Sequence, residues 1–162
     1  MNKAQIYQFL ADKKIEHEIT KHQAVYTMGE LFNVAVPYPQ CDAKNLFVRD
    51  DKHKNYYLIT VKGDKRVNLK QFRNQFNTRP LTFASADELM EIMSLIPGSV
   101  SPLGLLNDEN RVVKFYIDDE FFLAPNKIGI HPNENTATVW LNTDDLIALI
   151  SAHGNEITKI KI

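Results

Sequence analysis

Lys44 and Asn45 stand next to each other where the chain becomes apolar, and Lys44 could act on an ester or a phosphate. The three residues that follow, 46–48, are apolar, so we expect the pair to lie where a buried strand begins. A lysine ammonium held at the mouth of a cleft offers three N–H donors that can hold a phosphate or polarise an ester carbonyl. A lysine that only points into water from a strand end would give the same pattern.

A second segment, from Gly98 to Gly104, combines glycine, serine and proline. Gly98 lets the backbone approach a ligand closely, and Pro102 stiffens the loop so that its peptide groups point in constant directions. Ser99 and Ser101 are not interpreted as nucleophiles, because the chain has no Gly-x-Ser-x-Gly sequence and no Asp/His order typical of a triad. A turn that merely ends a helix is the structural alternative for this segment.

A third segment places His131 between Gly129 and Pro132, in a tight turn after a predicted strand. This is a suitable position for the wall of a pocket. An imidazole titrates near neutrality and could serve as a general base, although we rank a role in pocket shape above it. A histidine that donates to a backbone carbonyl would need no function. Asn135 and Thr136 could hold the turn or line the pocket.

Composition limits the chain to one globular domain. Its 162 residues, 44% of them hydrophobic, can bury one full core and leave little room for a second. No apolar run approaches the roughly 20 residues that span a bilayer, and residues 1–5 lack the apolar stretch of a signal peptide, so no membrane partner is expected. The single cysteine, Cys41, excludes an internal disulfide and fits a reducing cytoplasm.

No metal or nucleotide cofactor is expected from the motifs. The five histidines show no ligand spacing, and neither His-Glu-x-x-His nor Cys-x-x-Cys occurs. The glycine-rich loops that cradle nucleotide phosphates are absent as well.

The charge is distributed unevenly although the formal net charge is only −1. Residues 44–79 contain ten Lys/Arg and three Asp/Glu, whereas residues 80–162 contain five Lys/Arg and twelve Asp/Glu. The first segment could form a positive face that attracts phosphates and binds nucleic acid in a strongly salt-dependent way. A solvated surface that happens to be rich in lysine is the alternative interpretation.

Hydrophobic periodicity and capping signals predict an α+β domain over residues 1–162, with helices packed around a mixed sheet. Helices are expected after an Asn2 cap, from Met28 to before Pro37, over 68–76, from a capping box at Ser85 to about Leu95, and over 144–152 with Asn142 or Thr143 as the cap. Strands are expected at 15–21, 44–49, 56–62, 81–83, 112–117, 127–131, 136–141 and 157–162.

The three segments, in this order, resemble the YbaK-type aminoacyl-tRNA deacylases. These include free-standing prolyl-tRNA editing proteins and the editing domain inserted in bacterial prolyl-tRNA synthetases. The resemblance covers nearly the whole chain and extends to His22-x-Ala24-Val25-Tyr26-Thr27-x-x-Glu30 and to the closing strand, 157–162. It implies a strongly curved mixed sheet surrounded by helices.

The resemblance also implies a function and a site. The expected activity is hydrolysis of mischarged tRNA, above all alanyl-tRNA carrying a proline anticodon, with the 3′ acceptor end of aminoacyl-tRNA as partner and prolyl-tRNA synthetase as a further one. The implied catalytic residues are Lys44, at the terminal adenosine, and Asn45, at the substrate or the attacking water. The implied substrate-binding residues are Tyr26, Thr27, Gly98, Ser99, Ser101, Pro102, His131 and Asn135.

No strong protein base is visible in these segments, so the resemblance implies a substrate-assisted route in which the terminal ribose hydroxyl helps to orient water. Discrimination would come from a small rigid pocket, because contacts worth about 1–3 kcal/mol per methylene select weakly by attraction. Two alternatives stay open at this point. The pocket could accept serine, cysteine or threonine, or the domain could bind a tRNA end, an amino acid or a partner protein without catalysis.

Overall fold

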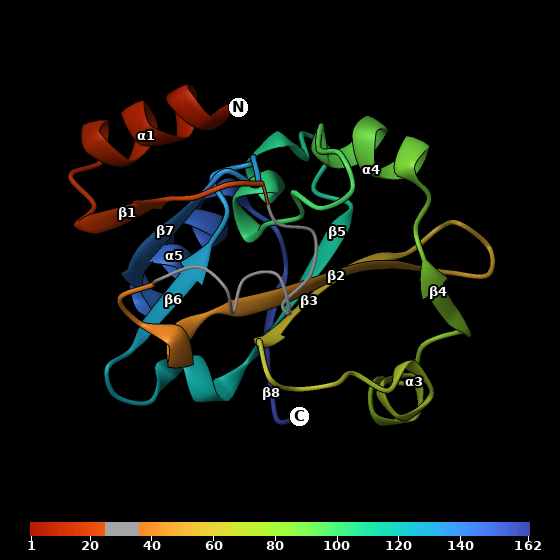
Figure 1. Cartoon of the computed structure of the whole chain (residues 1–162). Coiled ribbons are helices and arrows are strands. Elements are labelled where there is room, and N and C mark those ends of the chain that lie inside the picture. Colours follow the sequence, from red (N-terminus) through yellow and green to blue (C-terminus); the bar gives the residue numbers. More distant parts are fainter. Residues whose placement is uncertain (25–35) are drawn as a thin grey trace.

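The strands and helices alternate along the chain in an irregular order that is typical of the α+β class (Figure 1). The computed structural model describes residues 1–24 and 36–162, so the helix expected from Met28 lies outside the described residues. The elements are α1 (Lys3–Asp12), β1 (His17–Lys21), η1 (Pro39–Cys41), β2 (Ala43–Asp50), β3 (Tyr56–Lys62), α3 (Leu69–Phe76), β4 (Leu81–Phe83), α4 (Ala86–Met93), η2 (Pro102–Asn107), β5 (Val113–Asp118), η3 (Asp119–Phe122), β6 (Lys127–Ile130), β7 (Ala137–Asn142), α5 (Thr143–His153) and β8 (Ile157–Ile160).

The strands form two sheets instead of one continuous sheet. The larger has the order β4-β2-β3-β5-β8, antiparallel from β4 to β3 and parallel from β3 to β8. The smaller has the order β1-β7-β6 and is antiparallel throughout. An isolated parallel bridge between Asp42 and Gly129 joins them. The predicted α+β class with a mixed sheet is therefore confirmed, and the split into two sheets is the feature that the strand count could not predict.

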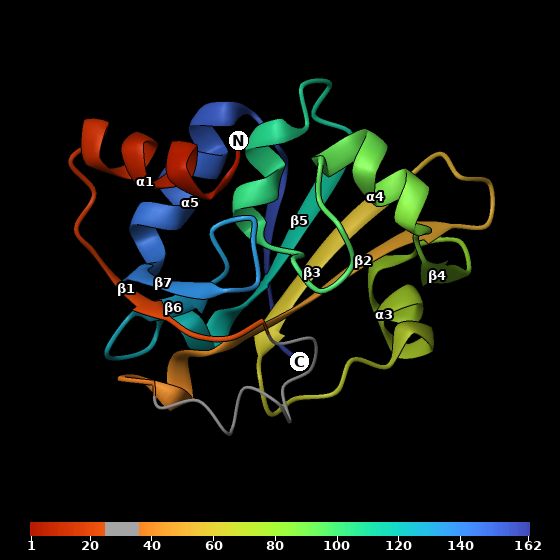
Figure 2. The same cartoon turned by 45° about the horizontal axis from the view of Figure 1, so that its top comes forward.

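Helices cover the two faces of the larger sheet unequally. Helices α4 and α5 lie on one side together with η2, whereas α3 lies on the other (Figure 2). The larger hydrophobic cluster fills the first side and includes Phe47, Leu58 and Phe115, one from each central strand. The smaller cluster packs Leu46 and Val48 of β2 and Ile59 of β3 against Phe72 of α3. Neighbouring residues of β2 thus face different clusters, as the pleat of a strand requires.

One helix boundary differs from the prediction for a local reason, and one of two predicted caps is confirmed. Helix α4 ends at Met93 and not near Leu95, because Ser94 adopts a left-handed conformation with φ 55° and its amide donates to the Met90 carbonyl. Asn142 caps α5 by accepting from the amides of residues 144 and 145. No helix in the described part of the chain is long and apolar enough to cross a bilayer.

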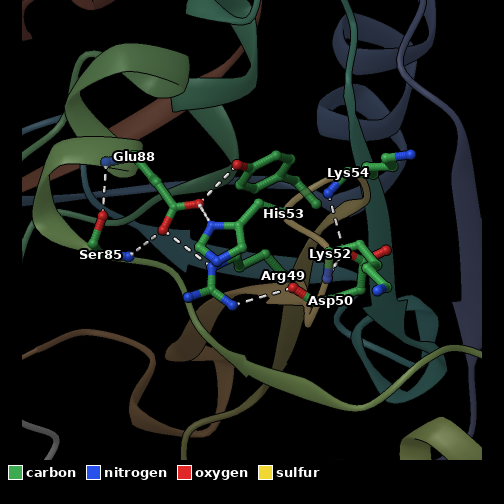
Figure 3. Close-up of polar contacts among 8 residues, drawn as sticks. Arg49, Asp50, Lys52, His53, Lys54, Ser85 and Glu88 are labelled. Atoms are coloured by element: carbon green, nitrogen blue, oxygen red, sulfur yellow. Dashed lines mark hydrogen bonds and ion pairs between the residues drawn. The ribbon is translucent and has the colours of Figure 1, made fainter.

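Glu88 ties α4 to the β2–β3 hairpin and is the centre of a polar cluster (Figure 3). Its Oε1 accepts from Arg49 Nε at 3.1 Å and from the Ser85 amide at 3.0 Å. Its Oε2 accepts from the Tyr56 hydroxyl at 2.7 Å and from His53 Nδ1 at 3.3 Å. Burial by itself raises the pKa of Glu88, but the donors from Ser85, Tyr56 and Arg49 outweigh it and hold the pKa at about 2.

A depressed carboxylate pKa contributes stability that is complete above the ordinary Glu pKa near 4.5 and is lost as pH falls toward about 2. We therefore expect Glu88→Gln to lower the free energy of unfolding at pH 7 by about 2 kcal/mol, the scale of hydrogen bonds to a charged group. The deficit should shrink between pH 4.5 and pH 3. Urea titrations over this range measure it, with Glu91→Gln, an exposed change on the same helix, as the control. A deficit independent of pH would contradict the assigned role.

Candidate functional site

The parallel bridge between Asp42 and Gly129 brings two of the predicted segments together. Both strands continue from the bridge in the same direction. Lys44 lies two residues after Asp42, and His131 lies two residues after Gly129. Gly129 is required here because a Cβ at this position would overlap the ring of Trp140, which is 1% exposed. The glycine of the third segment therefore has a packing role that allows the two sheets to join.

Lys44 and Asn45 leave β2 on opposite faces of the sheet. Lys44 lies on the side of Leu46, and its Nζ donates to the Lys65 carbonyl at 2.7 Å. Asn45 lies on the side of Phe47, and its Oδ1 accepts from the Thr60 hydroxyl at 2.6 Å. With Oδ1 facing Thr60, the two N–H groups of Asn45 have no hydrogen-bond partner within residues 1–24 and 36–162.

The carbonyl that Lys44 binds is itself held firmly. Lys65 Nζ forms ion pairs with Asp118 Oδ2 at 2.9 Å and Glu120 Oε1 at 3.2 Å, and the Asp118 side chain is fully buried. The Lys44 ammonium uses one N–H on the Lys65 carbonyl, and no other hydrogen-bond partner of its Nζ occurs within residues 1–24 and 36–162. It is therefore oriented while two donors stay free for substrate.

His131 is a partly buried imidazole directly after β6. Its Nδ1 lies 2.9 Å from the Ala137 carbonyl, and because a carbonyl only accepts, Nδ1 carries the proton. Burial lowers the pKa of His131, the Ala137 contact opposes the shift, and nearby His22, whose ring centre is 6.1 Å away, lowers it further. The ring is therefore neutral at pH 7, with its Nε2 lone pair facing no hydrogen-bond partner among the described residues.

The loop from Gly98 to Pro102 is more internal than the sequence indicates. Gly98 has φ 90°, a conformation that side chains rarely adopt, so its backbone freedom is needed. Ser99 and Ser101 are 1% and 0% exposed, and the Ser101 hydroxyl accepts from the Leu103 amide at 3.2 Å. Ser101 thus caps η2, and Pro102, also buried, is its first residue. This loop and the loop after β6 lie on the same side of the larger sheet (Figures 1 and 2).

Of the remaining predicted site residues, one is described by the structure and two are not. Asn135 is 6% exposed and lies in the loop between β6 and β7, beyond His131. Tyr26 and Thr27 lie outside the described residues. Cys41 is fully buried in η1, and burial raises the pKa of its thiol, which disfavours the reactive thiolate.

Sequence reasoning did not identify the residues that hold these groups in place. Thr60 orients Asn45, Lys65 orients Lys44, and His22 lies beside His131, with its Nε2 3.0 Å from the Thr138 hydroxyl. Of these residues, His22 belongs to the N-terminal part of the family pattern, and this was the one sequence signal that could have identified it as part of the site. No group of His, Cys, Asp or Glu in the part of the chain that the structure describes could hold a metal ion.

Asp42 is a further residue that the sequence did not indicate. It is 5% exposed, and its Oδ1 is a buried atom with no hydrogen-bond partner among the described residues. Desolvation raises the pKa of this carboxyl to about 7. A carboxyl of variable charge therefore lies at the sheet junction, two residues before Lys44.

Fold and site together describe a class of α+β protein that presents a lysine, an amide and a neutral imidazole around one sheet junction. Residues 22–149 match the model of the aminoacyl-tRNA editing domain. The chain belongs to this family, which confirms the resemblance drawn from the three segments.

Relatives with the same extent are found in bacteria and animals. The prolyl-tRNA editing protein ProX of Acetoanaerobium sticklandii is 34% identical over 153 residues, covering 94% of this chain and 93% of its own. The prolyl-tRNA synthetase associated domain-containing protein 1 of Mus musculus is 31% identical over 157 residues, covering 95% and 92%. A solved structure described as a candidate trans-editing enzyme for prolyl tRNA synthetase superposes with a TM-score of 0.68 at 18% identity, covering 100% and 98%, which shows the shared fold.

The raised pKa of Asp42 predicts how the free energy of unfolding depends on pH. The folded state binds this proton more tightly than the unfolded state, so stability is lost as pH rises from about 4 to about 7, by up to about 1.4 kcal/mol per pH unit. Asp42→Asn, which cannot ionise, should therefore be more stable relative to wild type at pH 8 than at pH 5. Urea unfolding at the two pH values measures the difference. An equal effect at both would show that Asp42 ionises normally.

Proposed function

We propose that this protein is a cytoplasmic hydrolase, with residues 1–162 as one domain, that removes alanine from tRNA bearing a proline anticodon. Membership of the aminoacyl-tRNA editing family supports the reaction, and the names of its relatives support prolyl-tRNA as the tRNA concerned. The observation that carries the proposal is the Asp42–Gly129 bridge, from which the two strands continue in parallel to Lys44 and His131, two residues on in each case. Prolyl-tRNA synthetase is the proposed partner, because it produces the mischarged substrate.

The reaction is the addition of water to the ester carbonyl, followed by cleavage of the bond between the acyl carbon and the ribose oxygen. The ribose oxygen leaves with a proton and the amino acid departs with its new carboxylate. This ester is already activated, so positioning water and the carbonyl is the main contribution required of the protein. The terminal ribose hydroxyl next to the ester can orient the water.

Lys44 and Asn45 would act from the two faces of β2. The two free N–H groups of the Lys44 ammonium suit a phosphate or the terminal adenosine, a role that its hydrogen bond to Lys65 leaves open. The Asn45 amide, oriented by Thr60, would donate to the ester carbonyl or the attacking water. The 3′ end would therefore lie across the start of β2.

His131 would act in selectivity. A neutral ring held to the Ala137 carbonyl is a rigid wall, and Gly98 supports the opposite loop through a conformation that a bulkier residue would strain. A rigid wall excludes proline by size, where attraction alone would discriminate by only about 1–3 kcal/mol per methylene. Alanine, with one methyl group, would enter the remaining space.

Lys44→Ala should reduce kcat for deacylation of alanyl-tRNA by about 100-fold or more, the scale seen when one donor to the reacting group is removed. Stability should fall by only about 1 kcal/mol, because one hydrogen bond to a carbonyl is lost. Single-turnover deacylation and thermal melting measure the two effects.

Lys62→Ala is the matched control, because Lys62 lies on the adjacent strand and its Nζ also donates to a carbonyl, that of Gln40, at 2.7 Å. The control should retain activity. Near-normal turnover by Lys44→Ala, or an equal loss of activity in both variants, would show that Lys44 takes no part in the reaction.

His131→Ala should relax discrimination, giving measurable hydrolysis of correctly charged prolyl-tRNA while alanyl-tRNA is still hydrolysed. The ratio of kcat/KM for the two substrates measures this. His17→Ala is the control, because His17 Nδ1 also lies 2.7 Å from a carbonyl, that of Ile15, but His17 is the first residue of β1 and belongs to none of the three segments. If His131→Ala loses activity on both substrates with no change in preference, His131 is a chemical group and the size filter is wrong.

A further inference from the structure

The structure separates the basic residues of the 44–79 segment into two equal groups. Five of them use their side chains internally, on carboxylates or backbone carbonyls: Lys44, Arg49, Lys62, Lys65 and Arg79. The other five are exposed, and their side chains make no hydrogen bond or ion pair within the described residues: Lys52, Lys54, Arg66, Lys70 and Arg73. Only this second group can contact an external partner without breaking an internal interaction.

Three of these five cations lie on α3 or the loop that precedes it. Lys70, Arg73 and Asn74 are all exposed and follow the i, i+3, i+4 spacing that aligns side chains on one face of a helix. The opposite face packs Phe72 into the smaller cluster, so the helix cannot turn this stripe inward. From residue 65 to residue 79 the chain contains no Asp or Glu. Lys70 and Arg73 therefore make the outer face of α3 positive, and neither forms an ion pair in the part of the chain that the structure describes.

This face lies on the same side of the larger sheet as Lys44. Lys44 and Leu46 share one face of β2 by strand alternation, and Leu46 belongs to the smaller cluster that includes Phe72 of α3. The loop between β3 and α3 connects the two places, since Lys44 binds the carbonyl of Lys65 and the exposed Arg66 follows directly. The exposed Arg66, Lys70 and Arg73 therefore follow, along the chain, the residue whose carbonyl Lys44 binds.

We propose that Arg66 and the outer face of α3 bind the phosphate backbone of the tRNA acceptor stem while its 3′ end reaches Lys44. This inference rests on the proposed function. Arg66, Lys70 and Arg73 supply charge to phosphates, and the neutral Asn74 adds hydrogen-bond donors without repulsion. Such contacts hold the stem in register and carry no sequence information.

The hairpin cations make a poorer phosphate surface. Lys52 and Lys54 lie in the turn that joins β2 to β3. They also flank Asp50 and Asp51, whose charges oppose a phosphate. The hairpin therefore provides a control surface with the same number of exposed lysine and arginine side chains as α3.

The test compares Lys70→Glu/Arg73→Glu with Lys52→Glu/Lys54→Glu. Each Lys/Arg→Glu change subtracts two charges, so both double variants move the formal net charge from −1 to −5. Three measurements are made: deacylation of full-length alanyl-tRNA, deacylation of a short alanylated 3′-terminal fragment without the stem, and binding of uncharged tRNA at several salt concentrations. Thermal melting verifies that both variants are folded.

The α3 variant should raise KM for full-length tRNA at least tenfold with kcat within twofold of wild type, and leave the fragment reaction unchanged. Its tRNA affinity should depend less steeply on salt, with the log–log slope reduced by about 1 to 2. The hairpin variant should match wild type within twofold in each assay.

Equal weakening by both variants would overturn the proposal, since net charge and not a surface would be responsible. Wild-type KM in the α3 variant, or equal loss on fragment and full-length tRNA, would overturn it as well. If wild type hydrolyses no aminoacyl-tRNA, the proposed function fails, whereas the binding measurement with uncharged tRNA still tests the α3 surface separately.

Discussion

The parallel bridge between Asp42 and Gly129 is the constraint on which the candidate site depends. It is the contact that joins the smaller sheet to the edge of β2, and the two strands continue from it to Lys44 and His131. It requires a glycine, because the Trp140 ring occupies the space of a side chain at residue 129. A buried carboxyl lies at the same point, so the junction combines tight packing with an uncompensated polar group.

The alternation of side chains along β2 divides the site between two environments. Lys44 shares its face with α3 and is oriented by the Lys65 carbonyl, whereas Asn45 shares its face with the larger core and is oriented by Thr60. A substrate that contacts both must cross the start of the strand. Under the proposed function, the nucleic acid would approach from the α3 side and the aminoacyl group would lie on the side of Asn45.

Short-range sequence patterns predicted the bounds of those strands and helices that begin and end at clear turn or capping residues. The strands at 56–62 and 81–83 were predicted to the residue, because alternation and turn residues bound them clearly. The end of α4 was predicted two residues too late, since the left-handed Ser94 has no sequence signature comparable to glycine. The short helix η2 was missed because its residues are held by burial and by the Ser101 cap, neither of which is periodic.

The sequence by itself determined the α+β class, the order of the elements and the residue types at the three segments, because these depend on short-range periodicity and motif spacing. Only the tertiary structure decided which charges are available and which groups are oriented. Lys65 and Arg66 are adjacent in sequence, yet one is held by Asp118 and Glu120 and the other is exposed. The raised pKa of Asp42 likewise arises from burial by distant segments. Hydrogen-bond partners and desolvation are long-range properties, so no local pattern encodes them.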